Sequence, residues 1–211
     1  MHLRNPRIVD RRIKLGWMQC VWALLALFGS AFSTLAQVDT VEVRIWGGQQ
    51  DDRGVRLIQL ADGDLLSLSS TNSTSTNQPQ AWVQRIDSNA HVVWESTLSD
   101  SPLLQPVDAV EHEDGRITVL SMRYASAVDG YDWHWQTLAP DGTPQGSQSW
   151  GTAAWDLPLR CFDRSGELWS VGMTYASGSG DVQWTRHVWT NENWMLSDAA
   201  SLGTEQEEVV T

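Results

Sequence analysis

The sequence predicts an all-β protein built from four-stranded antiparallel units that follow one another every 52 residues. The first observation is a set of two-residue positions that recur at this interval: Trp46-Gly47, Leu98-Ser99, Trp150-Gly151 and Leu202-Gly203. The second is a pair of Asp-Gly turns with the same spacing, at 62–63 and 114–115, each between two alternating apolar segments. Such a turn between alternating segments is a strong hairpin signal. The third is that no segment keeps a 3.6-residue apolar period over the length that a helix needs.

Four strands are expected in each unit. The first unit places them at 55–61, 64–70, 81–86 and 91–98. The second repeats them at 107–113, 116–123, 132–138 and 144–150, and the third at 157–163, 167–174, 181–189 and 193–200. Stacked sheets of four antiparallel strands are the blades of a β-propeller. We therefore expect a β-propeller-like array of four-stranded antiparallel blades.

The repeat also predicts how the chain is divided. The complete blades are expected at 47–98, 99–150 and 151–202. Residues 37–46 are interpreted as the last strand of a preceding blade, and 203–211 as the start of an unfinished one. About three complete units are fewer than the four to eight blades of closed propellers. We therefore expect an incomplete, truncated propeller, and the association of open arcs is the alternative.

The first unit carries the fullest form of the repeat: W-G-G at 46–48, A-D-G at 61–63 and A-W-V-Q-R-I-D-S-N-A-H-V-V-W at 81–94. This pattern resembles the bacterial secreted β-propeller repeats of the SBBP type. In this resemblance Trp82 matches the tryptophan of the repeat, 87–89 the D-x-N turn and Trp94 the closing tryptophan. Trp184 is expected to match Trp82 in the third unit, and His134 stands there in the second. The resemblance implies blades and no particular activity.

The N-terminus predicts export. Five basic residues come first: Arg4, Arg7, Arg11, Arg12 and Lys14. The apolar stretch 15–36 ends in small residues, with Thr34 and Ala36 placed as in a signal-peptide cleavage site. We expect residues 1–36 to be a signal peptide cleaved after Ala36, which makes the mature protein secreted or periplasmic. An uncleaved membrane anchor is the alternative, because 15–36 is long enough to cross the roughly 30 Å apolar core of a bilayer.

The chain after residue 36 is strongly acidic. It holds nine arginines, no lysine and 25 Asp and Glu residues, a formal net charge of −16. Such a charge repels nucleic-acid phosphates and anionic membrane surfaces, so we expect no nucleic-acid partner and no membrane insertion after signal cleavage. Cys161 is the one cysteine of this part of the sequence, which excludes an intrachain disulfide.

The loop at 47–54 groups three glycines and two aspartates before a strand. A phosphate loop needs a helix after its glycines or a lysine within them, and a calcium EF-hand needs oxygen ligands at alternate residues. This loop precedes a strand, has no lysine and lacks the alternate spacing, so we expect neither kind of site. Carboxylates recur at this place, since Asp52 aligns with Leu104, Asp156 and Glu208. We expect them to cap turns, and a cation held between blades is the alternative.

No residue is nominated for catalysis, for cofactor binding or for metal binding, and no cofactor is expected. The four histidines after residue 36 are scattered over the units without the spacing of zinc ligands: His91, His112, His134 and His187.

Tryptophan supplies much of the packing material, with 13 residues in the whole sequence. Those at recurring positions are expected to pack blade against blade: Trp46, Trp82, Trp94, Trp150 and Trp184. Four tryptophans outside the repeat pattern are expected nearer the turns or on alternate faces, where one or two could be exposed and stack on a sugar ring: Trp133, Trp135, Trp155 and Trp189.

These observations predict a non-catalytic binding or display scaffold at the cell envelope or outside the cell, with a protein or a polysaccharide as its partner. Self-association is a further expectation if the chain really comprises three and a half blades. The alternatives are a propeller lectin that binds glycans through exposed tryptophans, and part of a propeller enzyme that acts on glycans.

Overall fold

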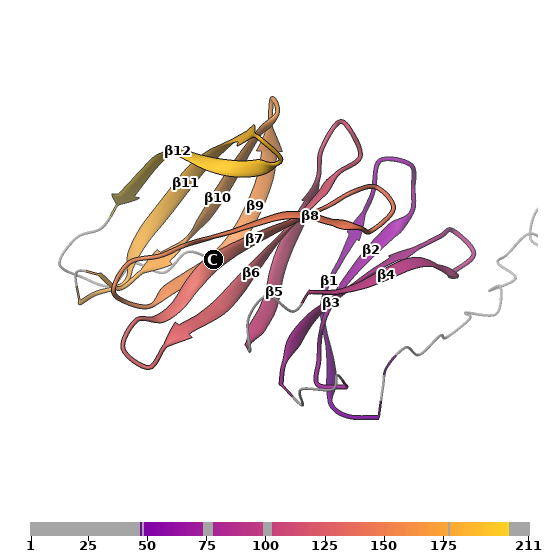
Figure 1. Ribbon diagram of the computed structural model, residues 1–211, viewed down its shortest axis with the longest axis horizontal. Helices are drawn as coiled ribbons and strands as arrows, with labels where there is room; N and C mark the ends of the chain where they lie inside the picture. Colours follow the sequence, from indigo (N-terminus) through magenta and orange to yellow (C-terminus); the bar gives the residue numbers. More distant parts are fainter. Residues whose placement is uncertain (1–46, 48, 74–77, 99–102, 177, 203–211) are drawn as a thin grey trace, which may run out of the picture. The chain divides into compact units, whose positions relative to one another are not determined.

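The computed structural model describes residues 47, 49–73, 78–98, 103–176 and 178–202. Within these ranges the expected all-β fold is confirmed: twelve strands form three four-stranded antiparallel sheets, without a helix (Figure 1). The expected signal peptide at 1–36 and the segments 37–46 and 203–211 lie outside the described residues. No helix in the described ranges is long and apolar enough to cross a membrane.

Consecutive strands are neighbours in each sheet. Sheet A consists of β1 (Asp52–Gln59), β2 (Leu65–Thr71), β3 (Gln80–Ile86) and β4 (Val92–Leu98). Sheet B consists of β5 (Leu104–Glu111), β6 (Ile117–Ser126), β7 (Gly130–Leu138) and β8 (Pro144–Trp150). Sheet C consists of β9 (Asp156–Arg164), β10 (Glu167–Thr174), β11 (Asp181–Thr190) and β12 (Asn193–Leu202).

The expected strands agree with the observed ones in number and order, and the first strands differ most in their bounds. β1 begins at Asp52 and β5 at Leu104, before the expected starts at 55 and 107. In both strands a β-bulge interrupts the register near the start, between Gly54 and Arg56 in β1. A bulge inserts one residue and breaks the two-residue alternation, so the apolar pattern cannot reveal the strand beyond it.

The expected equivalence of Trp82 and Trp184 is wrong. Asp52 opposes Thr71 in sheet A as Asp156 opposes Thr174 in sheet C, which fixes the correspondence of the two sheets. Thr71 then pairs with Gln80, two residues before Trp82, whereas Thr174 pairs with Asp181, three residues before Trp184. Because side chains alternate along a strand, the two tryptophans point to opposite faces of their sheets.

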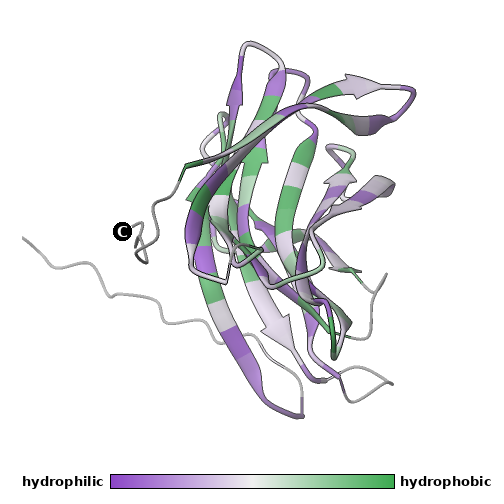
Figure 2. Cartoon of the chain, turned by 90° about the vertical axis from the view of Figure 1, so that its left-hand side faces the viewer, coloured by the Kyte–Doolittle hydropathy of each residue, from purple (hydrophilic) through white to green (hydrophobic). Residues whose placement is uncertain are grey.

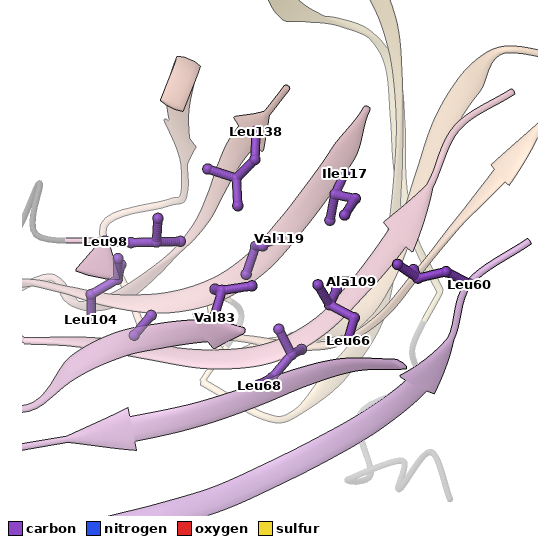
Figure 3. Close-up of a cluster of buried hydrophobic side chains, with 11 residues drawn as sticks. Leu60, Leu66, Leu68, Val83, Leu98, Leu104, Ala109, Ile117, Val119 and Leu138 are labelled. Carbon is purple, nitrogen blue, oxygen red and sulfur yellow. The ribbon is translucent and has the colours of Figure 1, made fainter. Parts of the chain in front are cut away.

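Sheets A and B join through an aliphatic core. Leu66, Leu68 and Val83 of sheet A are buried against Ile117 and Val119 of sheet B (Figure 3). These strands bury alternate residues, and β-branched or leucine side chains fill such half-buried sheet faces well. Trp94 of β4 adds a polar tie, because its indole N–H donates to the carbonyl oxygen of Pro140 at 3.0 Å.

Sheets B and C join through an aromatic core. Trp133, Trp135 and Trp194 are each at most 1% exposed and pack with Leu120 and Leu168. Trp133 and Trp135 are therefore not among the exposed tryptophans that could stack on a sugar ring, and neither lies at a turn. Both lie in β7, a strand of the middle sheet, which is covered on both sides. A strand buried on both faces lacks the polar-apolar alternation that marks a surface strand.

One carboxylate links the first strands of all three sheets. Asp108 of β5 is 3% exposed, and its Oδ1 lies 3.1 Å from Arg56 Nε of β1. Its Oδ2 accepts a hydrogen bond of 3.1 Å from the backbone N–H of Cys161 in β9. Burial raises the pKa of Asp108 above its ordinary value, while the Cys161 N–H and Arg56 favour the charged form. The side chain therefore bridges from sheet A to sheet C.

Replacing this carboxylate should destabilise the fold strongly. We expect Asp108→Ala to lower the free energy of unfolding by about 2–4 kcal/mol, since it leaves the Cys161 N–H and Arg56 without their partner. Urea unfolding followed by tryptophan fluorescence measures the loss. Glu113→Ala, at an exposed residue, is the matched control and should change stability by less than about 0.5 kcal/mol. Equal effects of the two substitutions would contradict the bridging role.

Candidate functional site

His112, Asp163 and Thr118 form a linear polar chain where sheets B and C meet. His112 Nδ1 lies 2.6 Å from Asp163 Oδ2, and His112 Nε2 lies 2.8 Å from Thr118 Oγ1. A carboxylate, an imidazole and a hydroxyl in this order are the parts of a nucleophilic triad. His112 and Asp163, together with Arg116 and Trp194, border a pocket of about 230 Å³.

The hydroxyl of this chain is not placed for attack on a substrate. Thr118 is fully buried, and its Oγ1 also accepts from the indole N–H of Trp194 at 2.9 Å and lies 3.1 Å from Thr137 Oγ1. The ring of Trp194 packs 4.9 Å from that of His112. A nucleophile needs an open approach to its oxygen, and here protein groups occupy it. These hydrogen bonds join β6 and the residue after β5 to β9 and β12.

The side chain of Arg116 lies against two tryptophans of sheet C at the same contact between sheets B and C. The guanidinium of Arg116 lies 4.0 Å from the ring centre of Trp189 and 5.9 Å from that of Trp194. Its Nε donates to Asp114 at 2.6 Å. A cation over aromatic faces contributes more as water is excluded, and the Arg116 side chain is 17% exposed. Arg116, which lines the pocket, thus also connects the turn after β5 to the tryptophans of sheet C.

An aromatic surface lies elsewhere on sheets B and C, formed by Tyr124, Tyr131 and Trp155. The ring of Tyr131 stands 5.5 Å from Tyr124 and 5.3 Å from Trp155, both edge to face. Trp155 is 52% exposed, which is unusual for so large an apolar side chain. Its backbone is held, since its carbonyl accepts from the Tyr175 N–H at 3.0 Å.

Local backbone geometry makes this surface possible. Gly130 has a φ of 75°, and a Cβ at this residue would overlap the indole of Trp155. Glycine is therefore required here both for its positive φ and for the close approach of the ring. Trp155 sits in the connection between β8 and β9, whereas Tyr124 and Tyr131 come from β6 and β7.

Two partly or fully buried carboxylates, Asp132 and Asp156, are close in the sequence to Tyr131 and Trp155. Asp132 follows Tyr131, and burial raises its pKa, with the opposite charge of Arg123 acting against that rise and Asp156 and Asp129 adding to it. Asp156 is fully buried and accepts from the backbone N–H and the hydroxyl of Thr152, at 2.5 and 3.0 Å.

The recurring carboxylates bind their own loops. Asp52 accepts from the Thr71 hydroxyl at 2.5 Å and from that of Ser73, while Asp156 holds Thr152. Asp156 thus caps the loop that precedes β9, whereas Asp52 joins the start of β1 to the end of β2. Asp51 is exposed, and Glu208 lies outside the described residues.

The histidines have separate surroundings. His91 is exposed beside Asp87, His134 faces the Ser149 hydroxyl at 2.9 Å, and His187 is fully buried against the ring of Trp135 at 4.3 Å. Among the described residues, no group of three or more His, Cys, Asp or Glu side chains is arranged to hold a metal ion.

The sequence did not indicate the pairing of His112 with Asp163 or the aromatic surface. The pairing had a usable signal, because the two residues lie 51 positions apart, almost one repeat. The contact between the Ala61 N–H and Glu111 spans 50 positions. Complementary residues about one repeat apart are thus candidates for contacts between successive sheets. The aromatic surface depends on loop conformation and had no such signal.

No protein-family model matches this chain, and no curated protein matches it. The resemblance to secreted β-propeller repeats therefore remains an expectation from the sequence.

His187 should make stability depend on pH. Burial lowers its pKa from 6.5 to about 4, so the folded protein resists protonation that the unfolded chain accepts. The contribution of neutral His187 to the free energy of unfolding is complete above pH 6.5. It is lost as the pH falls from 6.5 to about 4, by up to about 3 kcal/mol. We expect His187→Gln, which cannot take up the proton, to show a shallower fall in unfolding free energy over this range. Parallel curves for the two proteins, measured by urea unfolding at several pH values, would contradict this assignment.

Proposed function

We propose that the protein is an exported, non-catalytic scaffold of the β-propeller type that binds a polysaccharide at the cell envelope or outside the cell. The observation that carries the proposal is the aromatic surface of Tyr124, Tyr131 and Trp155, with its half-exposed indole. An exposed aromatic face stacks on the apolar face of a sugar ring.

The propeller assignment is supported by the way in which successive sheets meet. Their first strands β1, β5 and β9 are tied by Asp108, as the innermost strands of neighbouring blades would be. Each sheet follows the preceding one in the chain, and each has the same meander order. Three blades of this kind form an arc.

A scaffold role is supported by the use that the fold makes of its acid-base groups. His112, Asp163 and Thr118, which resemble a triad in connectivity, are buried and satisfied between two sheets. Asp52 and Asp156 bind the turns beside them. The exposed aromatic surface is made instead by loops and strand ends, where binding residues are commonly placed on rigid scaffolds.

Binding of a polysaccharide should depend on Trp155. We expect Trp155→Ala to weaken binding about tenfold or more, since one aromatic contact contributes roughly 0.5–1.5 kcal/mol beyond its buried area. Trp155→Phe should restore part of the affinity because it keeps a stacking face. A panel of immobilised polysaccharides, followed by calorimetry on those retained, provides the measurement.

Val128→Ala is the control for this test, because Val128 is 84% exposed and lies outside the ring contacts that define the aromatic surface. Folded protein that binds no polysaccharide, or that binds equally well with Trp155→Ala, would refute the proposed ligand class. The alternative of an enzyme that acts on glycans would show itself as new reducing ends released from a bound polysaccharide.

A further inference from the structure

The large exposed apolar side chains of the described strands are confined to the two terminal sheets. In sheet A, Leu57 is 60% exposed and Val92 is 38% exposed. In sheet C, Phe162, Val188 and Met195 are 45%, 40% and 52% exposed. None of the described residues of β5 to β8 is a large exposed hydrophobic. Among the described residues, sheet B packs against a sheet on both sides, whereas sheets A and C each have one side that no other described sheet covers.

The open face of sheet C, defined by the row Phe162, Trp169, Arg186 and Asp198 and its neighbours, is an aromatic ladder between arginines. Trp169 stacks on Phe162 at 6.4 Å and on Trp184 at 5.4 Å. The guanidinium groups of Arg164 and Arg186 lie 5.9 and 5.8 Å from the ring of Trp169. Figure 2 views the molecule from this side, and hydrophobic segments recur along the strands that face the viewer.

The open face of sheet A carries the cross-strand row Leu57, Ser67, Gln84 and Glu95, in which Leu57 and Glu95 on the edge strands are exposed and Gln84 is 3% exposed. These residues alternate with Leu66, Leu68 and Val83, which are buried against sheet B, so they point the other way. The described strand residues on this face include the carboxylates of Asp52 and Glu95 and no arginine. On the open face of sheet C, three arginines (Arg160, Arg164 and Arg186) outnumber the two carboxylates of Glu167 and Asp198, so the two faces carry net charges of opposite sign.

The two open faces also complement each other in their place within the repeat. Sheets B and C each turn one side toward the sheet that precedes them, and the open face of sheet A is the corresponding side of the first sheet. Sheets A and B each turn the opposite side toward the sheet that follows, and the open face of sheet C is the corresponding side of the last one. A contact between these faces would repeat the two contacts that the chain already makes.

We propose that the open face of sheet C binds the open face of sheet A in a second copy of this chain. The inference rests on the proposed propeller arrangement of the sheets. If both such contacts form, two copies close into a ring of six sheets about a twofold axis, and closed propellers hold four to eight blades. A head-to-tail contact that closes on itself gives a defined oligomer rather than a filament.

The arginines of the first strands are compatible with this contact. Positions 56, 108 and 160 are one repeat apart and hold Arg, Asp and Arg, so Arg160 of one copy would come near Arg56 of the other. Arg56 is already paired with Asp108 of its own chain at 3.1 Å. Arg160 is exposed, where solvent and salt screen its charge.

The test uses the full chain, recovered after export, in sedimentation velocity. The wild type should sediment as a dimer at micromolar concentration. Leu57→Glu on sheet A and Phe162→Glu on sheet C should each give a monomer, because each variant has lost one of the two faces that the ring needs. An equimolar mixture of these two variants should recover a dimer, since each supplies the face that the other lacks.

Val128→Glu, at a residue outside both open faces, is the control and should remain dimeric. Circular dichroism and cooperative unfolding establish that each variant is folded, and Ser67→Glu and Val188→Glu repeat the test at second positions. A monomeric wild type, a mixture that stays monomeric or an open-ended polymer would overturn the proposal. A monomer that becomes dimeric when residues 203–211 are deleted would also overturn it, because the chain then covers its own face.

The proposed dimer and the proposed function can be refuted independently of each other. A monomer that binds polysaccharide through Trp155 would remove the dimer and leave the ligand proposal intact. A dimer that binds no polysaccharide would do the reverse.

Discussion

The packing of the three sheets depends on the buried carboxylate of Asp108. Its two oxygens reach in opposite directions, to Arg56 in sheet A and to the Cys161 N–H in sheet C. A buried carboxylate is tolerated only when its oxygens are paired. Because the partners belong to different sheets, pairing the carboxylate fixes how β1 and β9 stand against β5. The apolar side chains of both seams then pack within that frame.

The two seams solve the same packing problem with different residues. Between sheets A and B, Trp94 is large and lies over Gly142, where a Cβ would come within 2.6 Å of the indole. Between sheets B and C, Gly146 stands one repeat after Trp94 and leaves room for the backbone of Glu192. Between sheets A and B, the large side chain at the edge of the contact is Trp94. Between sheets B and C, the large side chains are the buried tryptophans of β7 and β12. Each sheet is therefore fitted to its own neighbours.

The buried acid-base side chains and the exposed aromatic surface lie in different parts of the molecule. The imidazole, carboxylate and hydroxyl of His112, Asp163 and Thr118 stabilise the seam and leave no open nucleophile. Trp155 is held outward by a connection whose conformation requires Gly130. The rigid sheets hold the loops, and the loops carry the surface that a ligand could reach.

The sequence by itself determined the all-β class, the number and order of the strands and the positions of the turns, because hydrophobic alternation and turn residues act locally. It did not determine the faces of Trp184, Trp133 and Trp135. The face of Trp184 follows from the register of β10 with β11, and Trp133 and Trp135 are buried because the middle sheet is covered from both sides, which local patterns do not record. The pairing of His112 with Asp163 and the meeting of Tyr131 with Trp155 were likewise decided by tertiary structure. Contacts between separate sheets exist only once the sheets have stacked.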